Sequence, residues 1–344
     1  MRAPRSGGSP RRIRSVAVVL GVVGVALAVG IGTASAGDHR GWGRQHRPRP
    51  SASASRPVSP PASRPATPVT PGSSAASPGA TGPTSSAPPR TPAPTGGPAG
   101  VTRPPANAGF DYQIGQAYQV PAGVTVVSRD REAAPAAGAY NICYLNGFQA
   151  QPGELADWKR NHDDLLLKSG GAYVVDGDWN EVLLDTSTAA KREGLTTIVA
   201  GWMDGCAARG YRAVEIDNLD SWTRSKKLLT QANAVAYAKL LATAAHSRGL
   251  AIAQKNTVEI AAVGRSEVGF DFAIAEECAN YEISDGVPEC QGYVDAYGSA
   301  VIVIEYDATH FQQACSRYGS TLSIVQRDRD VTAPGSSSYV FKTC

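Results

Sequence analysis

The chain has 344 residues and a formal net charge of +3, and its charges are unevenly divided along the sequence. Residues 1–106 hold 13 of the 33 Lys and Arg residues but only Asp38 of the 30 acidic residues. Residues 107–344 therefore carry 20 basic and 29 acidic side chains, a net charge of −9. A nucleic-acid partner needs basic surface, so we expect no nucleic-acid binding, and the acidic balance favours a cationic or neutral ligand.

The N-terminus has the pattern of a secretory signal peptide. Three arginines between positions 11 and 14 precede an apolar run at 16–31, and Ala34-Ser35-Ala36 follows. A membrane anchor is the alternative, but the run is interrupted by glycine and is shorter than the roughly 20 residues of a spanning helix. We predict that residues 1–36 are a signal peptide cleaved after Ala36, so that the mature protein is secreted and not held by the membrane.

Residues 37–106 form a second segment, dominated by Pro, Ser, Ala, Thr and Gly. A segment with so few branched and aromatic side chains cannot offset the entropy lost on ordering. We predict a disordered linker, extended by its prolines, that ends where a domain at 107–344 begins.

Residues 107–344 are of a size that folds as one α/β barrel domain. Short apolar runs alternate with helical stretches such as 231–248, which is typical of parallel βα units. Eight runs are predicted as strands: Val124–Ser128, Ile142–Asn146, Val182–Asp185, Val214–Asp217, Ala251–Lys255, Ala273–Glu276, Val301–Glu305 and Ser323–Gln326. We predict an α/β fold, a (β/α)8 TIM barrel with an extra N-terminal strand at Asp111–Ile114. No glycine-rich phosphate motif follows a strand, so we expect no nucleotide cofactor.

All six cysteines lie in the predicted domain, an even number in a chain predicted to be exported. This favours disulfides over metal binding. The pairs Cys278 with Cys290 and Cys315 with Cys344 would close short loops, and Cys143 with Cys206 remains by elimination. The five histidines show no ligand spacing, so we predict no metal site.

The run at Val214–Asp217 ends in carboxylates, which avoid burial unless they are paired or take part in chemistry. If Val214 and Ile216 pack on the helices, Glu215 and Asp217 point into the barrel, with Asp217 at its C-terminal mouth. Substrate binds at that mouth in TIM barrels. The alternative is a structural role, with Glu215 and Asp217 paired to Lys255 or Arg327. Asn218, Asp220 and Trp222 follow, and an aromatic ring beside carboxylates suits sugar stacking.

The second carboxylate is ambiguous because Glu276 and Glu277 point in opposite directions. If Phe272 and Ile274 face the helices, alternation favours Glu277, but alternation is least reliable at strand ends. Further residues end strands and are candidates for the same mouth: Asp185, Lys255, Glu305, Tyr306 and Tyr144. The carboxylates among them could equally be solvated loop charges.

Four segments together resemble glycoside hydrolase family 114: 210–220, 250–256, 270–278 and 303–306. Members of this family are endo-α-1,4-polygalactosaminidases with a TIM barrel. The resemblance covers essentially the whole domain, including Asp111-Tyr112-Gln113 and Ile142-Cys143-Tyr144. It implies a secreted glycosidase that cleaves galactosamine polymers.

The resemblance places the catalytic nucleophile on Asp217 and the acid/base on Glu276, in a retaining scheme with two carboxylates. It therefore favours Glu276 over Glu277. The sequence departs from the family pattern at four positions: Ile216 replaces Pro, Ala275 replaces Asn, Glu277 replaces Gln and Trp222 replaces Tyr. An acid role for Glu276 requires a raised pKa, which we expect from burial and from the neighbouring Glu277 and Glu305.

The expected partner is a cationic or neutral galactosamine-containing polysaccharide, bound by a monomer. Asp185, Asp220 and Glu305 are expected to meet the ammonium groups of the sugar. Two other functions stay open: a barrel hydrolase that acts on another galactose-type or N-acetylated polysaccharide, and a non-catalytic polysaccharide-binding module. The presence of both Asp217 and Glu276 argues against the second.

Overall fold

The computed structural model describes residues 100–284 and 286–344. The predicted signal peptide and the linker up to residue 99 lie outside the described residues. The last predicted linker residues contact the domain, because Val101 packs on its core and the Tyr140 hydroxyl donates to the Thr102 carbonyl at 2.5 Å. Ordered contacts therefore begin upstream of Asn107. None of the helices in the described ranges is both long enough and apolar enough to cross a membrane.

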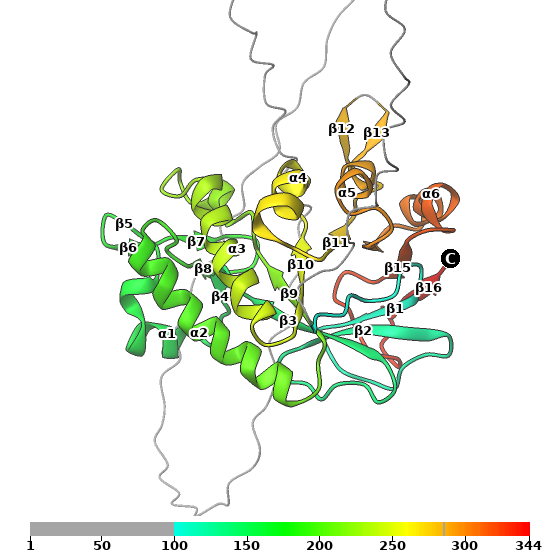
Figure 1. Ribbon diagram of the computed structural model, residues 1–344, viewed down its shortest axis with the longest axis horizontal. Helices are drawn as coiled ribbons and strands as arrows, with labels where there is room; N and C mark the ends of the chain where they lie inside the picture. The colour runs from blue at the N-terminus through cyan, green and yellow to red at the C-terminus, as the bar shows by residue number, and fades with distance from the viewer. Residues whose placement is uncertain (1–99, 285) are drawn as a thin grey trace, which may run out of the picture. The chain divides into compact units, whose positions relative to one another are not determined.

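The main sheet has eight parallel strands and forms the TIM barrel, nearly closed on itself (Figure 1). In sheet order the parallel strands are β1 (Gly109–Gln113), β2 (Val124–Asp130), β3 (Tyr140–Asn146), β9 (Ala213–Asp217), β10 (Ala251–Lys255), β11 (Phe272–Glu276), β14 (Val301–Glu305) and β15 (Ser323–Arg327). A short antiparallel strand, β16 (Phe341–Thr343), pairs with β15.

Helices cover only part of the barrel. They are α1 (Leu155–Asn161), α2 (Ala189–Ala208), α3 (Gln231–His246), α4 (Ala261–Val263), α5 (Glu289–Tyr297) and α6 (Ala308–Tyr318), with short 3₁₀ or π turns at Asp163–Leu165, Ser221–Arg224, Val258–Ile260 and Gly264–Val268. The helix predicted at 231–248 is α3, which begins at a capping box formed by Thr230 and Asn233. Within the described residues no helix separates β1 from β2 or β2 from β3, so this side of the barrel has no helical layer (Figure 1).

Alternation along each strand divides the apolar residues into two clusters. On β9, Ala213 belongs to the cluster inside the barrel, whereas Val214 and Ile216 pack with residues of α2 and α3. Glu215 and Asp217 share the parity of Ala213 and therefore point inward. The same parity puts Lys255 of β10 inside, because Ala251 and Ala253 belong to the inner cluster.

Two of the predicted strands exchange roles. The strand expected as an N-terminal addition is β1, which pairs in parallel with β2 and is one of the eight barrel strands. The run predicted at Val182–Asp185 is not a barrel strand: β8 (Glu181–Leu183) pairs antiparallel with β4 (Gln149–Ala150) and β7 (Val175–Asp176) in a separate small sheet. A short apolar run carries no information about its partner or direction, which is why the sequence pattern misplaced it. Two more hairpins join β5 (Lys168–Ser169) to β6 (Ala172–Tyr173) and β12 (Glu282–Ser284) to β13 (Val287–Pro288).

The seam between β1 and β15 is bridged by Arg327, which is fully buried. Its guanidinium contacts Asp111 Oδ1 at 2.9 Å and donates to the carbonyls of Tyr112, Thr332 and Val340. Every one of these acceptors lies on β1 or on the segment after β15, so the arginine joins the first and last parallel strands.

All three predicted disulfides are confirmed. Cys143 of β3 is bonded to Cys206 of α2, and Cys315 of α6 is bonded to the C-terminal Cys344. Cys278 is bonded to Cys290, which ties the loop after β11 to the start of α5. This third bond therefore holds the segment that directly follows Glu276.

Candidate active site

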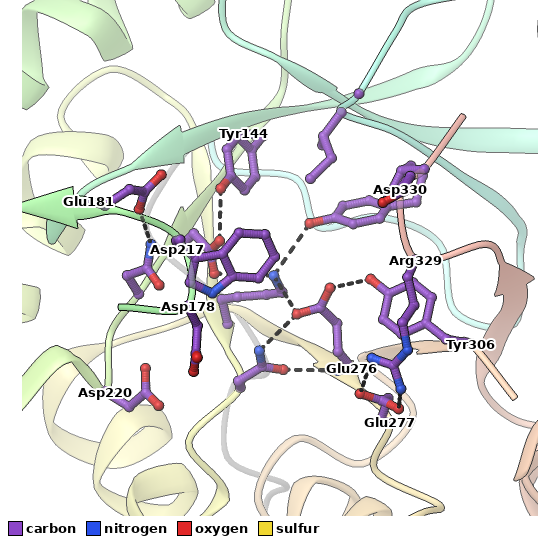
Figure 2. A pocket seen from close by; sticks show the side chains of 18 of the residues that line it. Tyr144, Asp178, Glu181, Asp217, Asp220, Glu276, Glu277, Tyr306, Arg329 and Asp330 are labelled. Atoms are coloured by element: carbon purple, nitrogen blue, oxygen red, sulfur yellow. Dashed lines mark hydrogen bonds and ion pairs between the residues drawn. The ribbon is translucent and has the colours of Figure 1, made fainter. Parts of the chain in front are cut away.

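The C-terminal ends of β9, β10 and β11 bring Asp217, Lys255 and Glu276 together in a pocket at the barrel mouth (Figure 2). The Lys255 ammonium lies 3.1 Å from Asp217 Oδ1 and 3.0 Å from Glu276 Oε2. The lysine is 2% exposed, whereas the side chains of Asp217 and Glu276 are 20% and 24% exposed. One buried cation thus holds two carboxylates that remain open to the pocket.

Glu215 lies one layer deeper and does not line the pocket. Its carboxylate accepts hydrogen bonds from Tyr112 at 2.9 Å and Ser128 at 2.6 Å, and lies 3.5 Å from the Lys255 ammonium. Burial raises the pKa of Glu215 to about 7, although Lys255 and Ser128 counteract the rise. Glu215 and Asp217 thus both pair with Lys255, as the structural alternative predicted, but Asp217 also lines the pocket.

Tyrosine and asparagine side chains orient the two exposed carboxylates. Tyr144 donates to Asp217 Oδ2 at 2.7 Å, and Tyr306 donates to Glu276 Oε1. Asn256 donates to Glu276 Oε2 at 3.0 Å and accepts from the backbone N–H of the same residue at 2.8 Å. Each carboxylate is therefore held from two sides before any ligand arrives.

The expected raised pKa of Glu276 is wrong for this state of the site. Burial by itself would raise the pKa, but the Lys255 ammonium and the hydrogen bonds from Tyr306 and Asn256 stabilise the ionised form and lower the pKa to about 2. The pKa of Lys255 is raised well above its ordinary value, since its three carboxylate neighbours outweigh burial. Glu276 is thus a carboxylate beside an ammonium.

The choice between Glu276 and Glu277 depends on which face of β11 is buried in the barrel. Phe272 and Ile274 belong to the inner cluster, while Ala273 and Ala275 pack toward the helices. The premise that Phe272 and Ile274 face the helices was wrong, and with the correct phase simple alternation points Glu276 inward. Glu277 has a positive φ of 56° and lies at the rim.

The small sheet formed by β4, β8 and β7 contributes one wall of the pocket, which the sequence pattern did not predict. Glu181, at the start of β8, accepts from Asn146 Nδ2 at 2.8 Å and Asn218 Nδ2 at 3.4 Å. Burial, together with the nearby charges of Asp217 and Asp176, raises the pKa of Glu181 to about 8. The only signal in the sequence was the turn-like Gly177 to Asn180 before the apolar run.

The aromatic residue at this wall is Trp179 and not Trp222. Trp179 lies in the turn between β7 and β8, lines the pocket and is 48% exposed. Trp222 is partly buried against two apolar clusters and is not among the pocket-lining residues. The predicted stacking role of Trp222 therefore finds no support in its position.

Two other predicted contacts also lie away from the pocket. Strand β8 starts at the pocket with Glu181 and runs away from the pocket, and Asp185 lies beyond its far end. The Asp185 carboxylate pairs with Lys191. Glu305 shares the parity of Val301 and Val303 and so faces the helix side. Its Oε1 accepts from the backbone N–H of Ala279, and burial raises its pKa to about 8.

The remaining predicted contacts line the pocket: Tyr144, Asn218, Asp220, Lys255 and Tyr306. Asp220 forms an ion pair with Arg224 at 2.9 Å. Glu277 forms one with Arg329 at 2.5 Å (Figure 2). Asn256 follows a predicted strand by one residue and Arg329 follows one by three residues, positions that could have identified them. In all, seven acidic and three basic side chains line the pocket, an excess of four negative charges.

The structure places one possible metal-ligand group among the described residues. Cys278, Cys290 and Glu305 have ligand atoms within 4.8 Å of one another. The two cysteines are joined in a disulfide, so neither sulfur is a thiolate in this state.

Comparison with known proteins agrees with this architecture. The model of glycoside-hydrolase family GH114 matches residues 91–344. Ega3 from Aspergillus fumigatus, solved in complex with galactosamine, superposes with a TM-score of 0.55 at 21% identity, covering 71% of this chain and 98% of that one. The glycoside hydrolase domain of PelA from Pseudomonas aeruginosa has a TM-score of 0.44 at 15% identity, covering 67% and 98%. A search of curated proteins gave no match.

Proposed function

The chain belongs to glycoside hydrolase family 114, and from this premise we propose that it cleaves α-1,4-linked galactosamine polymers internally, with Asp217 as nucleophile and Glu276 as acid/base. The single observation that carries the proposal is the pair of pocket carboxylates held by one buried ammonium. Both are hydrogen-bonded in fixed orientations, as a pre-organised catalytic pair requires.

The spacing of the pair supports a retaining reaction. Because Asp217 Oδ1 and Glu276 Oε2 lie 3.1 Å and 3.0 Å from the same nitrogen, they cannot be farther apart than the sum of these distances, about 6.1 Å. Retaining glycosidases have carboxyl groups about 5–5.5 Å apart, and inverting enzymes need about 6.5–9.5 Å to admit a water. The limit applies to the two oxygens that face Lys255 and is compatible with the retaining spacing, so we propose a retaining reaction.

In the first step an Asp217 oxygen attacks the anomeric carbon and the bond from this carbon to the glycosidic oxygen breaks. Glu276 gives its proton to the departing oxygen. In the second step Glu276, now a carboxylate, takes a proton from a water whose oxygen attacks the anomeric carbon, and Asp217 is released. Because Glu276 is ionised in the empty pocket, the first step requires proton uptake when the sugar displaces water and removes solvation from the carboxylate.

A cationic substrate is supported by the charge of the pocket. Its lining has a formal excess of four negative charges, or three when Glu181 is protonated, and the domain as a whole carries a formal −9. A concave acidic site attracts cations and increases their local concentration. Ega3, which shares the fold, was crystallised with galactosamine. We also propose Trp179 as the surface on which a sugar ring stacks, since its exposed ring lies at the pocket wall.

We propose that the enzyme acts outside the cell as a monomer. Three disulfides and the absence of free cysteines among the described residues support an oxidising compartment. N-terminal sequencing of the secreted protein tests the predicted cleavage after Ala36, and light scattering tests the monomer.

The deciding experiment measures release of reducing ends from two polymers of equal length, α-1,4-galactosamine and its fully N-acetylated form. We expect hydrolysis of the galactosamine polymer, weakened at higher ionic strength because salt screens exposed charges beyond about 10 Å at 0.1 M. Equal rates on both polymers with no salt effect would favour a hydrolase of N-acetylated or neutral galactose polymers. Binding of a polymer without release of reducing ends would indicate a non-catalytic polysaccharide-binding module.

A further inference from the structure

Glu181 lies on the Asp217 side of the pocket, and Tyr306 and Arg329 lie on the Glu276 side (Figure 2). The Glu181 carboxylate accepts hydrogen bonds from Asn146 and Asn218. Both asparagines adjoin Asp217, because Asn218 follows Asp217 in the chain and Asn146 is the register partner of Asp217 on β3. Glu181 is 7% exposed and lines the pocket. Its carboxylate is thus fixed beside the proposed nucleophile.

The chemistry of galactosamine requires a partner at this place. The amino group is on C2, which is bonded directly to the anomeric carbon that Asp217 would attack. The ammonium of the cleaved unit must therefore lie close to Asp217. Any residue that recognises it must reach the same side of the pocket.

Four of the other pocket carboxylates already have a cationic partner. Asp217 and Glu276 share Lys255, Asp220 pairs with Arg224, and Glu277 pairs with Arg329. Glu181 receives only amide hydrogen bonds and has no ion pair among the described residues. It is a buried acid whose ionised form lacks a cation.

We infer that Glu181 binds the 2-ammonium group of the galactosamine unit that Asp217 attacks, and so determines the preference for amino sugar over N-acetylated sugar. This rests on the proposed function. The ligand completes an ion pair that the empty site lacks, and charge-assisted hydrogen bonds of this kind are stronger than neutral ones. An N-acetyl group carries no charge and cannot form it.

The electrostatics of the empty site support this assignment. Burial, Asp217 on β9 and Asp176 on β7 raise the pKa of Glu181 to about 8, while Asn146 and the ion-paired Arg224 counteract the rise. Without a bound cation Glu181 is therefore mostly protonated at neutral pH. An ammonium placed against it lowers its pKa, so binding of the amine should release a proton from Glu181.

The test uses the full chain in a Glu276→Gln background, which stops turnover and lies across the pocket from Glu181. Calorimetry compares this protein with the double variant that adds Glu181→Gln, at about pH 6 and in buffers of different ionisation enthalpy. The ligands are matched oligomers of α-1,4-galactosamine and N-acetylgalactosamine. Glutamine keeps an oxygen that accepts from both asparagines, and Glu181→Asp is the second variant if Glu181→Gln lowers the melting temperature.

We expect Glu181→Gln to weaken binding of the galactosamine oligomer about 10- to 100-fold and to abolish proton release. The affinity for the acetylated oligomer should change little. Equal losses on both oligomers, or unchanged proton release, would overturn the assignment. A selective loss in Asp220→Asn but not in Glu181→Gln would transfer the role to Asp220.

The turnover of the unmodified chain separates the two proposals. If it cleaves galactosamine polymer and Glu181→Gln shows no selective loss, only the role of Glu181 fails. If it neither binds nor cleaves that polymer, the proposed function fails and the inference fails with it.

Discussion

Lys255 and Arg327 are two buried cations of the barrel with opposite consequences. Lys255 is held by the carboxylates of Asp217, Glu276 and Glu215, two of which reach the pocket. Arg327 is held by one fully buried carboxylate, Asp111, and by three backbone carbonyls. We call these the lysine cluster and the arginine cluster.

The difference lies in what each cation leaves available. The acceptors of Arg327 are a fully buried carboxylate and backbone carbonyls of β1 and of the segment after β15, so the arginine cluster is closed and joins β1 to β15. In the lysine cluster the acceptors are side chains at strand ends, and Asp217 and Glu276 keep exposed oxygens that a substrate can meet. A buried charge thus stabilises the fold when its partners face inward and serves chemistry when they open to a cavity.

The largest expected effect is on the lysine cluster. Asp217→Asn and Glu276→Gln should each lower kcat by about 10²- to 10⁴-fold or more, since general acid help alone contributes that much. Both variants keep the size of the side chain, so their melting temperatures should stay near that of the parent. Initial rates of reducing-end release measure the effect, and a near-normal rate in either variant would remove that residue from the catalytic pair.

The arginine cluster should respond in stability instead. Arg327→Met leaves Asp111 buried without its cation and should lower the free energy of unfolding by about 3–5 kcal/mol, with the rate per folded molecule preserved. Urea unfolding measures this. Arg329→Met is the matched control, because Arg329 pairs with Glu277 at the rim and should contribute about 1 kcal/mol or less. If both variants lost a similar free energy of unfolding, Arg327 at the β1–β15 seam would be no more important for stability than Arg329 at the pocket rim.

A third change tests how the lysine controls its partner. Lys255→Met removes the main cause that lowers the pKa of Glu276, so this pKa should rise. The alkaline limb of the pH–rate profile, which reports loss of the proton that Glu276 donates, should move to higher pH by about one unit, equivalent to about 1.4 kcal/mol. An unmoved limb together with a lower rate would mean that Lys255 positions the carboxylates without setting their charge.

Glu305 differs from the acids of both clusters because it is buried with no ion pair among the described residues. Its pKa is raised from 4.5 to about 8, so between these values the folded state keeps a proton that the unfolded state has lost. Stability is then highest below about pH 4.5 and falls as pH rises toward 8, by about 1.4 kcal/mol per unit from this group. Glu305→Gln should flatten the decline of melting temperature between pH 5 and pH 8. An unchanged slope would assign the decline to Glu181 and Glu215.

Local patterns were sufficient for several features. Apolar runs located the strands β2, β3, β9, β10, β11, β14 and β15, because each buries side chains on both faces of a parallel sheet. The spacing of the cysteines led to all three disulfides. Carboxylates at the ends of β9 and β11 marked the mouth, since an unpaired charge is rarely placed at the end of a core strand without a role.

Other features needed long-range information. Alternation shows that successive side chains of β11 point to opposite faces, but it does not show which face meets the helices. That face decides whether Glu276 or Glu277 points into the barrel, and the structure selects Glu276. The direction of β8 depends on its partners β4 and β7, and this direction brings Glu181 to the pocket while Asp185 points away.

By itself, then, the sequence determined the class of fold, seven of the eight barrel strands, the disulfide framework and the presence of carboxylates at the ends of two strands. These follow from composition, local periodicity and covalent spacing. Tertiary structure alone decided the closing role of Arg327, the choice of Trp179 over Trp222 at the pocket wall and the low pKa of Glu276. Each of these depends on distances between groups far apart in the chain, because Coulomb energy and burial are set by where side chains meet.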